Sequence, residues 1–390
     1  MISEKIANNV RNGSMIRAMF EEGEKLRKIH GNDKVFDFSL GNPDPEPPAA
    51  VREAIIKYAS QPGIHKYMSN AGYDDSREKI ADNINKKYEL SLTKDHIIMT
   101  CGAAGGLNVV LKTILNPGEE VIVFAPYFVE YGFYADNHGG KIVECQTDND
   151  FQPDPSALAK SITKNTKAII LNTPNNPTGV VYSEDILVKL SEVLEAKEKE
   201  YGITIYVISD EPYTKLLYDN CKLPSILKIF RNSIIVNSYS KSLSLPGERI
   251  GYIAINPSSN YVDELISGMI FCNRTLGYVN APSLFQKVIT ETIDETVDVS
   301  IYEKRRDVLY NHLINLGFSC VKPQGAFYLF PKALIADDIE FKDRALKYNL
   351  LLVPGTNFGR PGYFRLAYCV DLKTIENSLP AFEALAKEFK

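Results

Sequence analysis

The sequence predicts an α/β protein with a mostly parallel sheet in a large domain and a smaller α+β domain after it. Through the middle of the chain, short runs rich in Ile and Val alternate with longer segments that are apolar every three or four residues. Consecutive apolar residues are typical of strands buried on both faces, and the longer spacing is typical of helices with one buried face. Such alternation over roughly 180 residues indicates βαβ units and a sheet covered by helices on both sides.

Six apolar runs mark the expected strands. They cover residues 96–100, 120–125, 167–172, 204–209, 233–237 and 249–255. Between the third and fourth runs, residues 183–200 are expected to form a helix whose first turn is capped by the Ser183 side chain. An earlier helix, which includes the sequence LNVVLKTIL, is expected to end before the turn at 116–118.

The two ends of the chain lack this alternation. Residues 39–48 contain too many prolines for a helix or a strand, so we expect an extended crossing segment there. After about residue 285 a long helical region begins. Short apolar runs follow it at 325–330, 351–355 and 363–368. We therefore expect a large domain at 49–285 and a small domain that combines 1–48 with 286–390.

Composition excludes several classes of protein. The net charge is −5, so the chain has no excess of basic residues for binding a nucleic-acid backbone. It contains no run of about 18 apolar residues that could span a membrane, and the N-terminal sequence MISEKIANNV has no apolar signal core. We therefore expect no nucleic-acid partner, no membrane association and a cytoplasmic location.

The cysteines and histidines indicate neither disulfides nor a metal site. The cysteines are Cys101, Cys145, Cys221, Cys272, Cys320 and Cys369. They are scattered without a CxxC pair, and none of the five histidines stands in an HxxxH pattern. Free thiols in a reducing compartment are expected, and a bound metal is not.

The first candidate for a binding site follows the first apolar run, since ligands of open α/β sheets bind outside the carboxyl ends of the strands. In the sequence CGAAGGL, Gly102, Gly105 and Gly106 let the backbone approach a phosphate at the start of a helix. A tight turn without a ligand explains the pattern equally well. A nicotinamide site is disfavoured, because the acidic residue expected about 20 positions later falls in an apolar strand.

Three further strand ends carry candidate residues. Phe128 follows the second run, where its ring could lie against a planar ligand, although core packing is the commoner role of a single Phe. The constrained turn at 173–179, TPNNPTG, presents the amide of Asn176, and a plain surface turn is the alternative. Asp210 follows the fourth run, with Tyr213 three residues later. The Asp210 carboxylate needs a cationic or hydrogen-bonding partner if it is buried, and a helix N-cap is the alternative.

Lys241 follows the fifth run, in the segment NSYSKSLSLPGER. A lysine in a recessed site loses its proton more easily and can then form an imine with a carbonyl group. The alternative is a lysine that binds phosphate as a point charge. The segment lacks the glycines of a P-loop, however, and Ser238 and Arg249 are better phosphate donors.

One arginine is placed inside a short apolar strand. Arg365 stands in the sequence YFRLAY and needs an anionic partner if it is buried. A substrate carboxylate held by two parallel hydrogen bonds is one such partner. A structural ion pair between the two domains is the other.

Taken together, these segments resemble those of pyridoxal-phosphate enzymes of fold type I, in the aspartate aminotransferase family, class I/II. The matching segments are SLGNPDP, HKYMSNAG, GAAGGL, APYF, NNPTG, DEPY, SYSKSLSLPGER and PGTNFGRPGYFRLAY, and they extend over nearly the whole chain. Their order and spacing make the resemblance specific. It implies a seven-stranded sheet in a large cofactor-binding domain, pyridoxal 5'-phosphate as cofactor, and a homodimer with shared active sites.

The resemblance also implies a role for each candidate residue. Lys241 would hold the cofactor and move a proton at the substrate α-carbon, and Asp210 would pair with the nitrogen of the cofactor ring. Asn176 and Tyr213 would hydrogen-bond the phenolic oxygen of the ring, and Phe128 would stack on the ring face. The phosphate would be held by Gly102, Ala103, Ala104, Ser238, Arg249 and, from the neighbouring subunit, Tyr67.

On the substrate side, the resemblance implies that Arg365, Asn176 and the backbone of Gly41 bind the α-carboxylate of an L-amino acid. Ala104 lacks the hydroxyl or amine that many relatives have at its position, so phosphate binding there would rely on the backbone. Arg274 lies about one residue from the position of an arginine that, in dicarboxylate-specific relatives, reaches over from the partner subunit and binds a second substrate carboxylate. An ordinary surface arginine is the alternative.

The expected function is an aminotransferase that moves the α-amino group of an L-amino acid, with aspartate as first choice, to a 2-oxo acid in two half-reactions. A pyridoxal-phosphate-dependent β-lyase or decarboxylase would use the same residues and is the alternative. A regulatory sensor is a remoter one, because only about 38 residues precede SLGNPDP, too few for an added DNA-binding domain.

Overall fold

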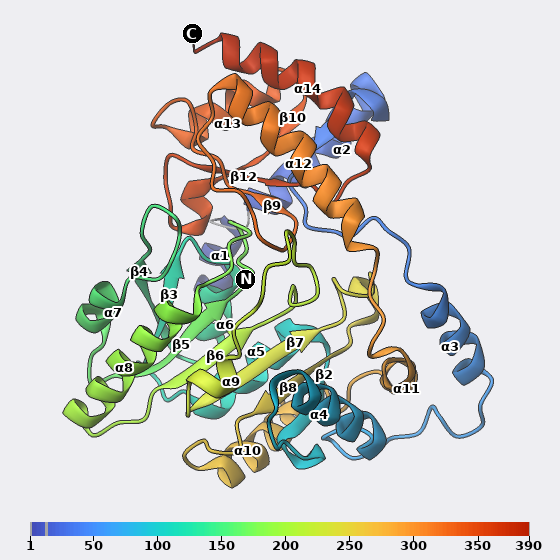
Figure 1. Cartoon of the computed structure of the whole chain (residues 1–390), viewed down its shortest axis with the longest axis vertical. Helices are drawn as coiled ribbons and strands as arrows, with labels where there is room; N and C mark the ends of the chain where they lie inside the picture. The colour runs from blue at the N-terminus through green and yellow to red at the C-terminus, as the bar shows by residue number, and fades with distance from the viewer. Residues whose placement is uncertain (1, 12–14, 390) are drawn as a thin grey trace.

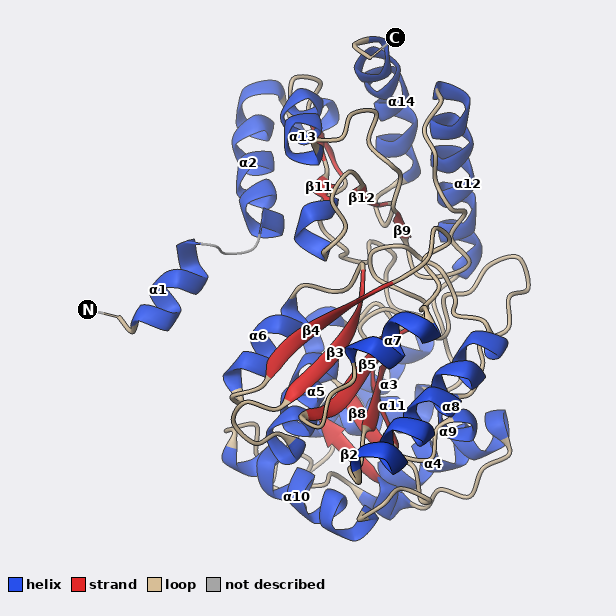
Figure 2. Cartoon of the chain, turned by 90° about the vertical axis from the view of Figure 1, so that its left-hand side faces the viewer, coloured by secondary structure: helices blue, strands red, loops and turns tan. Residues whose placement is uncertain are grey.

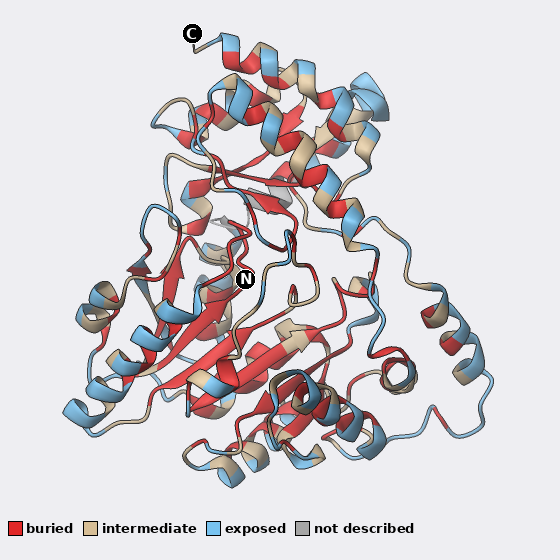
Figure 3. Ribbon diagram, viewed as in Figure 1, coloured by how far each residue is buried: buried red, intermediate tan, exposed pale blue. Residues whose placement is uncertain are grey.

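The computed structural model describes residues 2–11 and 15–389 of the chain. Figure 1 shows a large body around one central sheet, with a smaller group of helices and short strands above it. Apart from one edge strand, the strands of the central sheet are mostly buried (Figure 3). Among the described residues, no helix combines the length and apolar character needed to span a membrane.

The central sheet has seven strands in the order β2-β8-β7-β6-β5-β3-β4. They are β2 (Ile97–Thr100), β3 (Glu120–Ala125), β4 (Lys141–Gln146), β5 (Thr166–Asn172), β6 (Tyr206–Asp210), β7 (Ser233–Ser238) and β8 (Gly251–Ile255). β8 runs antiparallel to both of its neighbours, β2 and β7, and all other neighbouring strands of this sheet pair in parallel. The predicted α/β class and mostly parallel sheet are therefore confirmed, and each of the six apolar runs overlaps a strand. The edge strand β4 has mainly exposed or half-buried side chains, which is why no apolar run marks it.

Helices cover both faces of this sheet, as Figure 2 shows. On one face lie α5 (Gly102–Ile114), α6 (Glu130–Asn137) and α10 (Val262–Thr275), which share a hydrophobic cluster with the strands. On the other lie α7 (Pro155–Ser161), α8 (Glu184–Tyr201) and α9 (Ile226–Ile229). The expected cap is present, because the Ser183 hydroxyl accepts a hydrogen bond of 3.3 Å from the Ile186 amide at the start of α8.

The smaller group of elements is built on two short sheets. One contains β9 (Tyr328–Leu329), β11 (Val353–Pro354) and β12 (Phe364–Ala367), and the other pairs β1 (Phe36–Asp37) with β10 (Leu350–Leu351). They are packed against α12 (Val299–Leu316), α13 (Asp338–Leu346) and α14 (Leu372–Lys387). The β1–β10 pair joins an N-terminal segment to the C-terminal part of the chain, and α2 (Met15–His30) contacts β1 through an ion pair of 2.8 Å between Arg27 and Asp37. The remaining helix of the N-terminal region is α1 (Glu4–Arg11).

A third group of helices packs beside the β2 edge of the central sheet. It contains α3 (Ala49–Ala59), α4 (Asp74–Tyr88) and α11 (Ser283–Thr292). The predicted domain boundary at residue 285 falls inside α11, whose Val288 and Ile289 are in one hydrophobic cluster with Val51 and Ile80. The division of the chain at this point stays a prediction. Short 3₁₀ helices at Asn32–Lys34, Lys94–His96, Pro246–Glu248 and Gly355–Phe358 complete the described elements.

Candidate active site

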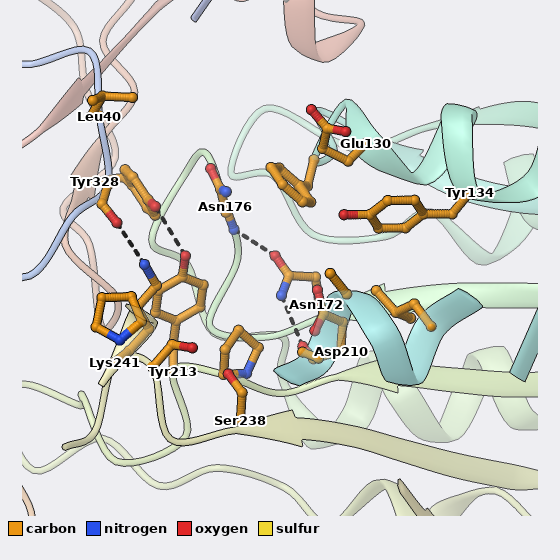
Figure 4. Close-up of a pocket in the computed structure, with 18 of the residues that line it drawn as sticks. Leu40, Glu130, Tyr134, Asn172, Asn176, Asp210, Tyr213, Ser238, Lys241 and Tyr328 are labelled. Atoms are coloured by element: carbon orange, nitrogen blue, oxygen red, sulfur yellow. Dashed lines mark hydrogen bonds between the residues drawn. The ribbon is translucent and has the colours of Figure 1, made fainter. Parts of the chain in front are cut away.

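A cavity of about 380 Å³ lies at the carboxyl ends of the central strands, between the large sheet and the small sheet that contains β9 and β12 (Figure 4). Residues that line it are Leu40, Gly41, Ala103, Ala104, Leu107, Phe128, Glu130, Tyr134, Asn172, Asn176, Asp210, Pro212, Tyr213, Ser238, Ser240, Lys241, Pro246, Arg249, Tyr328 and Arg365. The cavity therefore brings together most of the predicted site residues from distant parts of the chain.

Lys241 reaches the cavity from the loop that follows β7. Its Nζ donates a hydrogen bond of 2.6 Å to the backbone carbonyl of Gly41. Burial, helped by the charges of Arg365 and Arg249 and partly opposed by Cys369, lowers the pKa of the Lys241 ammonium to about 8. An amine with such a pKa is uncharged in about a tenth of the molecules at pH 7 and in about half at pH 8, so it can act as a nucleophile.

Asp210 is the last residue of β6 and lines the cavity on the side away from Lys241 (Figure 4). Its Oδ2 accepts a hydrogen bond of 2.6 Å from the Tyr131 hydroxyl. Its Oδ1 is buried and has no hydrogen-bond partner among the described residues. Burial raises the pKa of this carboxyl to about 6, and the Tyr131 hydrogen bond partly opposes the rise. Oδ1 is therefore placed to accept from a protonated nitrogen of a bound group, since an unpaired buried carboxylate is costly.

Two asparagines fix the turn after β5. The Asn172 amide donates a hydrogen bond of 2.8 Å to the Asp210 carbonyl, and its Oδ1 accepts one of 2.7 Å from the Asn176 backbone amide. Both side chains are buried, and both line the cavity. The predicted rigid turn thus holds Asn176 in the site, and the plain surface turn considered as the alternative is wrong.

Tyr213 contributes a buried hydroxyl that lies 3.0 Å from the hydroxyl of Tyr328. Tyr328 comes from β9 and also packs its ring under the Arg365 guanidinium, 4.8 Å from the ring centroid. Burial raises the pKa values of both tyrosines, so both stay protonated near neutral pH. Each can therefore donate a hydrogen bond to an oxygen of a bound group.

Arg365 on β12 is a buried cation, with 2% of its surface exposed. It donates hydrogen bonds to Asn176 Oδ1 at 3.1 Å and to the Ser39 carbonyl at 2.5 Å. Among the described residues no carboxylate lies within ion-pair distance of it, and its Nε has no hydrogen-bond partner. The structural ion pair considered for this residue is therefore not formed, and the guanidinium is open to an anion in the cavity.

Gly102, Ala103, Ala104, Ser238 and Arg249 gather where α5 begins. Gly102 has φ of +73°, and a Cβ atom there would lie 2.9 Å from Arg249 Nη2. The glycine thus permits the guanidinium to approach the first turn of the helix. The start of α5, the Ser238 hydroxyl and the guanidinium together provide donors for a phosphate group.

Phe128 lines the cavity with its ring partly exposed, and the ring packs edge-on against Tyr131 with centroids 5.6 Å apart. Tyr67 and Arg274 do not line the cavity of their own chain. The Tyr67 side chain is 90% exposed and borders a separate hollow beside Tyr278. Arg274, at the exposed end of α10, lies over the Phe271 ring at 5.4 Å. Within the part of the chain that the structure describes, no cluster of His, Cys, Asp or Glu could hold a metal ion.

Sequence reasoning missed several residues of the cavity, of which the most important are Tyr131, Asn172, Tyr328, Glu130 and Tyr134. Asn172 was discoverable, because it is the last residue of an apolar run and lies directly before the constrained turn. Tyr131 and Tyr134 stand in an aromatic-rich segment with no local mark of function. Tyr328 comes from another sheet, and only the fold brings it to Tyr213.

Comparison with known proteins identifies the class. The model of the family "Aminotransferase class I and II" matches residues 33–382, and the chain belongs to this family. A probable aspartate aminotransferase of Methanocaldococcus jannaschii is 34% identical, with 88% of this chain and 91% of that protein covered. The aspartate aminotransferase of Thermotoga maritima is 32% identical, with coverage of 91% and 92%.

Solved structures give the same result. An amino transferase from Eubacterium rectale is 40% identical, covers both chains completely and superposes with a TM-score of 0.97. The aspartate aminotransferase of Thermus thermophilus with maleate is 29% identical, covers 99% of both chains and has a TM-score of 0.86. The chain is thus an aminotransferase that uses pyridoxal phosphate. The unpaired Asp210 Oδ1 and the donors around Gly102 fit the nitrogen and the phosphate of this cofactor.

Proposed function

We propose that this aminotransferase takes the amino group of L-aspartate, passes it to a 2-oxo acid, and uses the residues of the cavity described above to do so. The observation that carries the proposal is the buried Arg365 guanidinium, which has no carboxylate partner among the described residues and lines the same cavity as Lys241. A substrate α-carboxylate supplies the missing charge. Asn176, already hydrogen-bonded to Arg365, and the backbone of Gly41 complete its binding site.

The cofactor would be held from several sides. Lys241 would hold its aldehyde carbon covalently, and Asp210 Oδ1 would accept the proton of the ring nitrogen. Tyr213 and Asn176 would hydrogen-bond the phenolic oxygen, and Phe128 would cover the ring. The phosphate would be held by Gly102, Ala103, Ala104, Ser238 and Arg249.

When bound, pyridoxal phosphate supplies an electron sink that stabilises negative charge at the substrate α-carbon. Asp210 would keep the ring nitrogen protonated, because its buried Oδ1 would gain a partner only when that proton is present. Lys241, whose amine has a pKa of about 8, would accept and hold the proton of the substrate α-carbon. Arg365 binds the α-carboxylate and thereby holds the Cα–H bond of the substrate within reach of the Lys241 amine.

Aspartate is proposed as the donor because several relatives carry the name aspartate aminotransferase. We also propose a homodimer, in which Tyr67 of each chain donates to the phosphate in the other active site. The 90% exposure of the Tyr67 side chain supports this arrangement. Free thiols at all six cysteines support the cytoplasm as the location. For the domains we propose a large unit at 49–285 and a small unit at 1–48 with 286–390.

The proposal is tested by the visible absorbance of the purified protein with pyridoxal phosphate, before and after addition of L-aspartate. Conversion of the aldehyde form of the cofactor to its amine form, with release of the matching 2-oxo acid, is expected. A cofactor spectrum that does not respond to aspartate, but responds to other amino acids, would refute aspartate as donor. Release of ammonia with pyruvate would indicate a lyase reaction instead.

A further inference from the structure

The cavity contains one charged side chain that none of these roles uses. Its charged lining residues are Glu130, Asp210, Lys241, Arg249 and Arg365. The last four have partners in the cofactor or in the substrate α-carboxylate. Glu130, in the first turn of α6, has neither an ion-pair partner nor a hydrogen-bonded side chain among the described residues. Because the other four residues already bind the cofactor and the substrate α-carboxylate, the substrate side chain is the group that Glu130 can contact.

The surroundings of Glu130 show what it could bind. It is half-buried, and burial raises the pKa of its carboxyl above the ordinary value. Tyr134, one helical turn later on α6, lines the same cavity, and Figure 4 shows both side chains on the same wall. This part of the wall offers a carboxylate, a phenol hydroxyl and the ring of Phe128. The cations of the cavity, Lys241, Arg249 and Arg365, are already assigned to the cofactor and the α-carboxylate, so none of them is left for a second substrate carboxylate.

From this wall we infer that Glu130 selects an amino acid whose side chain ends in a cationic nitrogen, and that this amino acid is the second substrate of the enzyme. The inference rests on the proposed function, since an aminotransferase binds two amino acids in turn at one site. A protonated side-chain amine would pair with the carboxylate, and its methylene groups would lie against the ring of Phe128. In the direction proposed above, aspartate gives its α-amino group to the 2-oxo acid of the cationic substrate, so that the 2-oxo acid of aspartate and the cationic amino acid are formed, and the reverse transfer uses the same site. No oxidant is needed.

A purely structural role for Glu130 makes a different prediction. A carboxylate in the first turn of a helix is favoured by the helix dipole, whatever ligand the cavity holds. Removing that contribution would lower stability, and with it the activity toward every substrate by the same factor. A role in selection changes the ratio between substrates. The ratio is therefore the quantity to measure.

The experiment compares the wild-type enzyme and Glu130→Gln, loaded with pyridoxal phosphate, on L-lysine, L-norleucine and L-aspartate. Norleucine matches lysine in shape except for the terminal ammonium. Apparent dissociation constants come from the cofactor absorbance, and kcat/KM from product formation. Glu184→Gln is the matched control, because Glu184 is also in the first turn of a helix, α8, but is exposed and does not line the cavity.

We expect kcat/KM of the wild-type enzyme to be about tenfold higher for lysine than for norleucine, because a hydrogen bond between charged groups contributes about that much. Glu130→Gln should remove this preference. Aspartate should bind several-fold more tightly to Glu130→Gln, because its side-chain carboxylate no longer faces another carboxylate. Equal lysine-to-norleucine ratios in the two proteins, or an equal loss on all three substrates, would overturn the inference. A wild-type enzyme that converts aspartate but not lysine would overturn it too, whereas failure on aspartate alone would refute only the proposed donor.

Discussion

Replacement of Asp210 by Asn should stabilise the cofactor-free protein while weakening the binding of the cofactor. The Asp210 side chain is buried, its Oδ1 has no partner among the described residues, and its only charge-compensating contact is the Tyr131 hydroxyl at 2.6 Å. An asparagine has almost the same shape and can still accept that hydrogen bond through its amide oxygen. The substitution therefore removes a buried negative charge and little else.

The size of the effect follows from the pKa of Asp210, which burial raises from 3.8 to about 6. A carboxyl that holds its proton more tightly in the folded state costs stability once the pH rises above its unfolded pKa. The cost grows from about pH 4 and is complete above about pH 6, where the difference of about 2.2 units, at 1.36 kcal/mol per unit, amounts to about 3 kcal/mol. At pH 5 about half of this cost is present. Asp210→Asn is free of it at every pH.

The assay is thermal unfolding of the cofactor-free wild-type and Asp210→Asn proteins at pH 8 and pH 5. A gain of about 3 kcal/mol in a chain of this length corresponds to a rise in Tm of about 3–4 °C at pH 8, and about half of that is expected at pH 5. Burial raises the pKa of Glu211 to about 7, and the Asp210 charge contributes to that rise. Loss of this charge in Asp210→Asn therefore lowers the Glu211 pKa and adds to the expected gain at pH 8. A Tm of Asp210→Asn at or below the wild-type value at pH 8 would refute the reasoning.

Three further substitutions test the remaining assignments. Lys241→Ala should still bind pyridoxal phosphate but lose the borohydride-trapped attachment, and its turnover should fall by about 10²–10⁴-fold or more; near-normal turnover would contradict the proposed role. Arg365→Lys keeps the charge but not the two parallel hydrogen bonds, so the KM for aspartate should rise about tenfold or more, and an unchanged KM would count against carboxylate binding. Tyr67→Phe should weaken cofactor binding by about tenfold through loss of one hydrogen bond to the phosphate, measured by equilibrium titration; equal affinity would argue against the contact between subunits.

The sequence predicts the central sheet well because its strands are buried on both faces. Each of the six apolar runs overlaps a strand, and the polar residue at the end of a run, such as Asp210 or Asn172, must then lie at the carboxyl edge of the sheet. Parallel strands bring these ends together without any further information. That geometric rule alone predicts that Asn176 and Lys241 share one cavity, as they do.

What the sequence does not predict depends on contacts between distant segments. Tyr328 is one aromatic residue among many until β9 brings its hydroxyl to 3.0 Å from that of Tyr213. Glu130 looks like an ordinary first-turn acid of a helix, and only the cavity shows that its carboxylate is not solvated like a surface residue. The sequence pattern does not mark strand β4, because a strand at the edge of a sheet does not need consecutive apolar residues.

The cavity places several uncompensated groups in one buried volume, and this links folding to ligand binding. Within the described part of the chain, the Asp210 carboxylate has no cationic partner and Arg365 has no anionic one, so each costs the cofactor-free protein free energy that a bound group recovers. A ligand that binds only the folded state stabilises it by about 2.7 kcal/mol at one hundred times its Kd. If part of that gain is the pairing of Asp210, pyridoxal phosphate at a fixed concentration must raise the Tm of the wild-type protein more than that of Asp210→Asn. Equal shifts in the two proteins would mean that the cofactor ring does not use this carboxylate, whatever the activities of the two enzymes are.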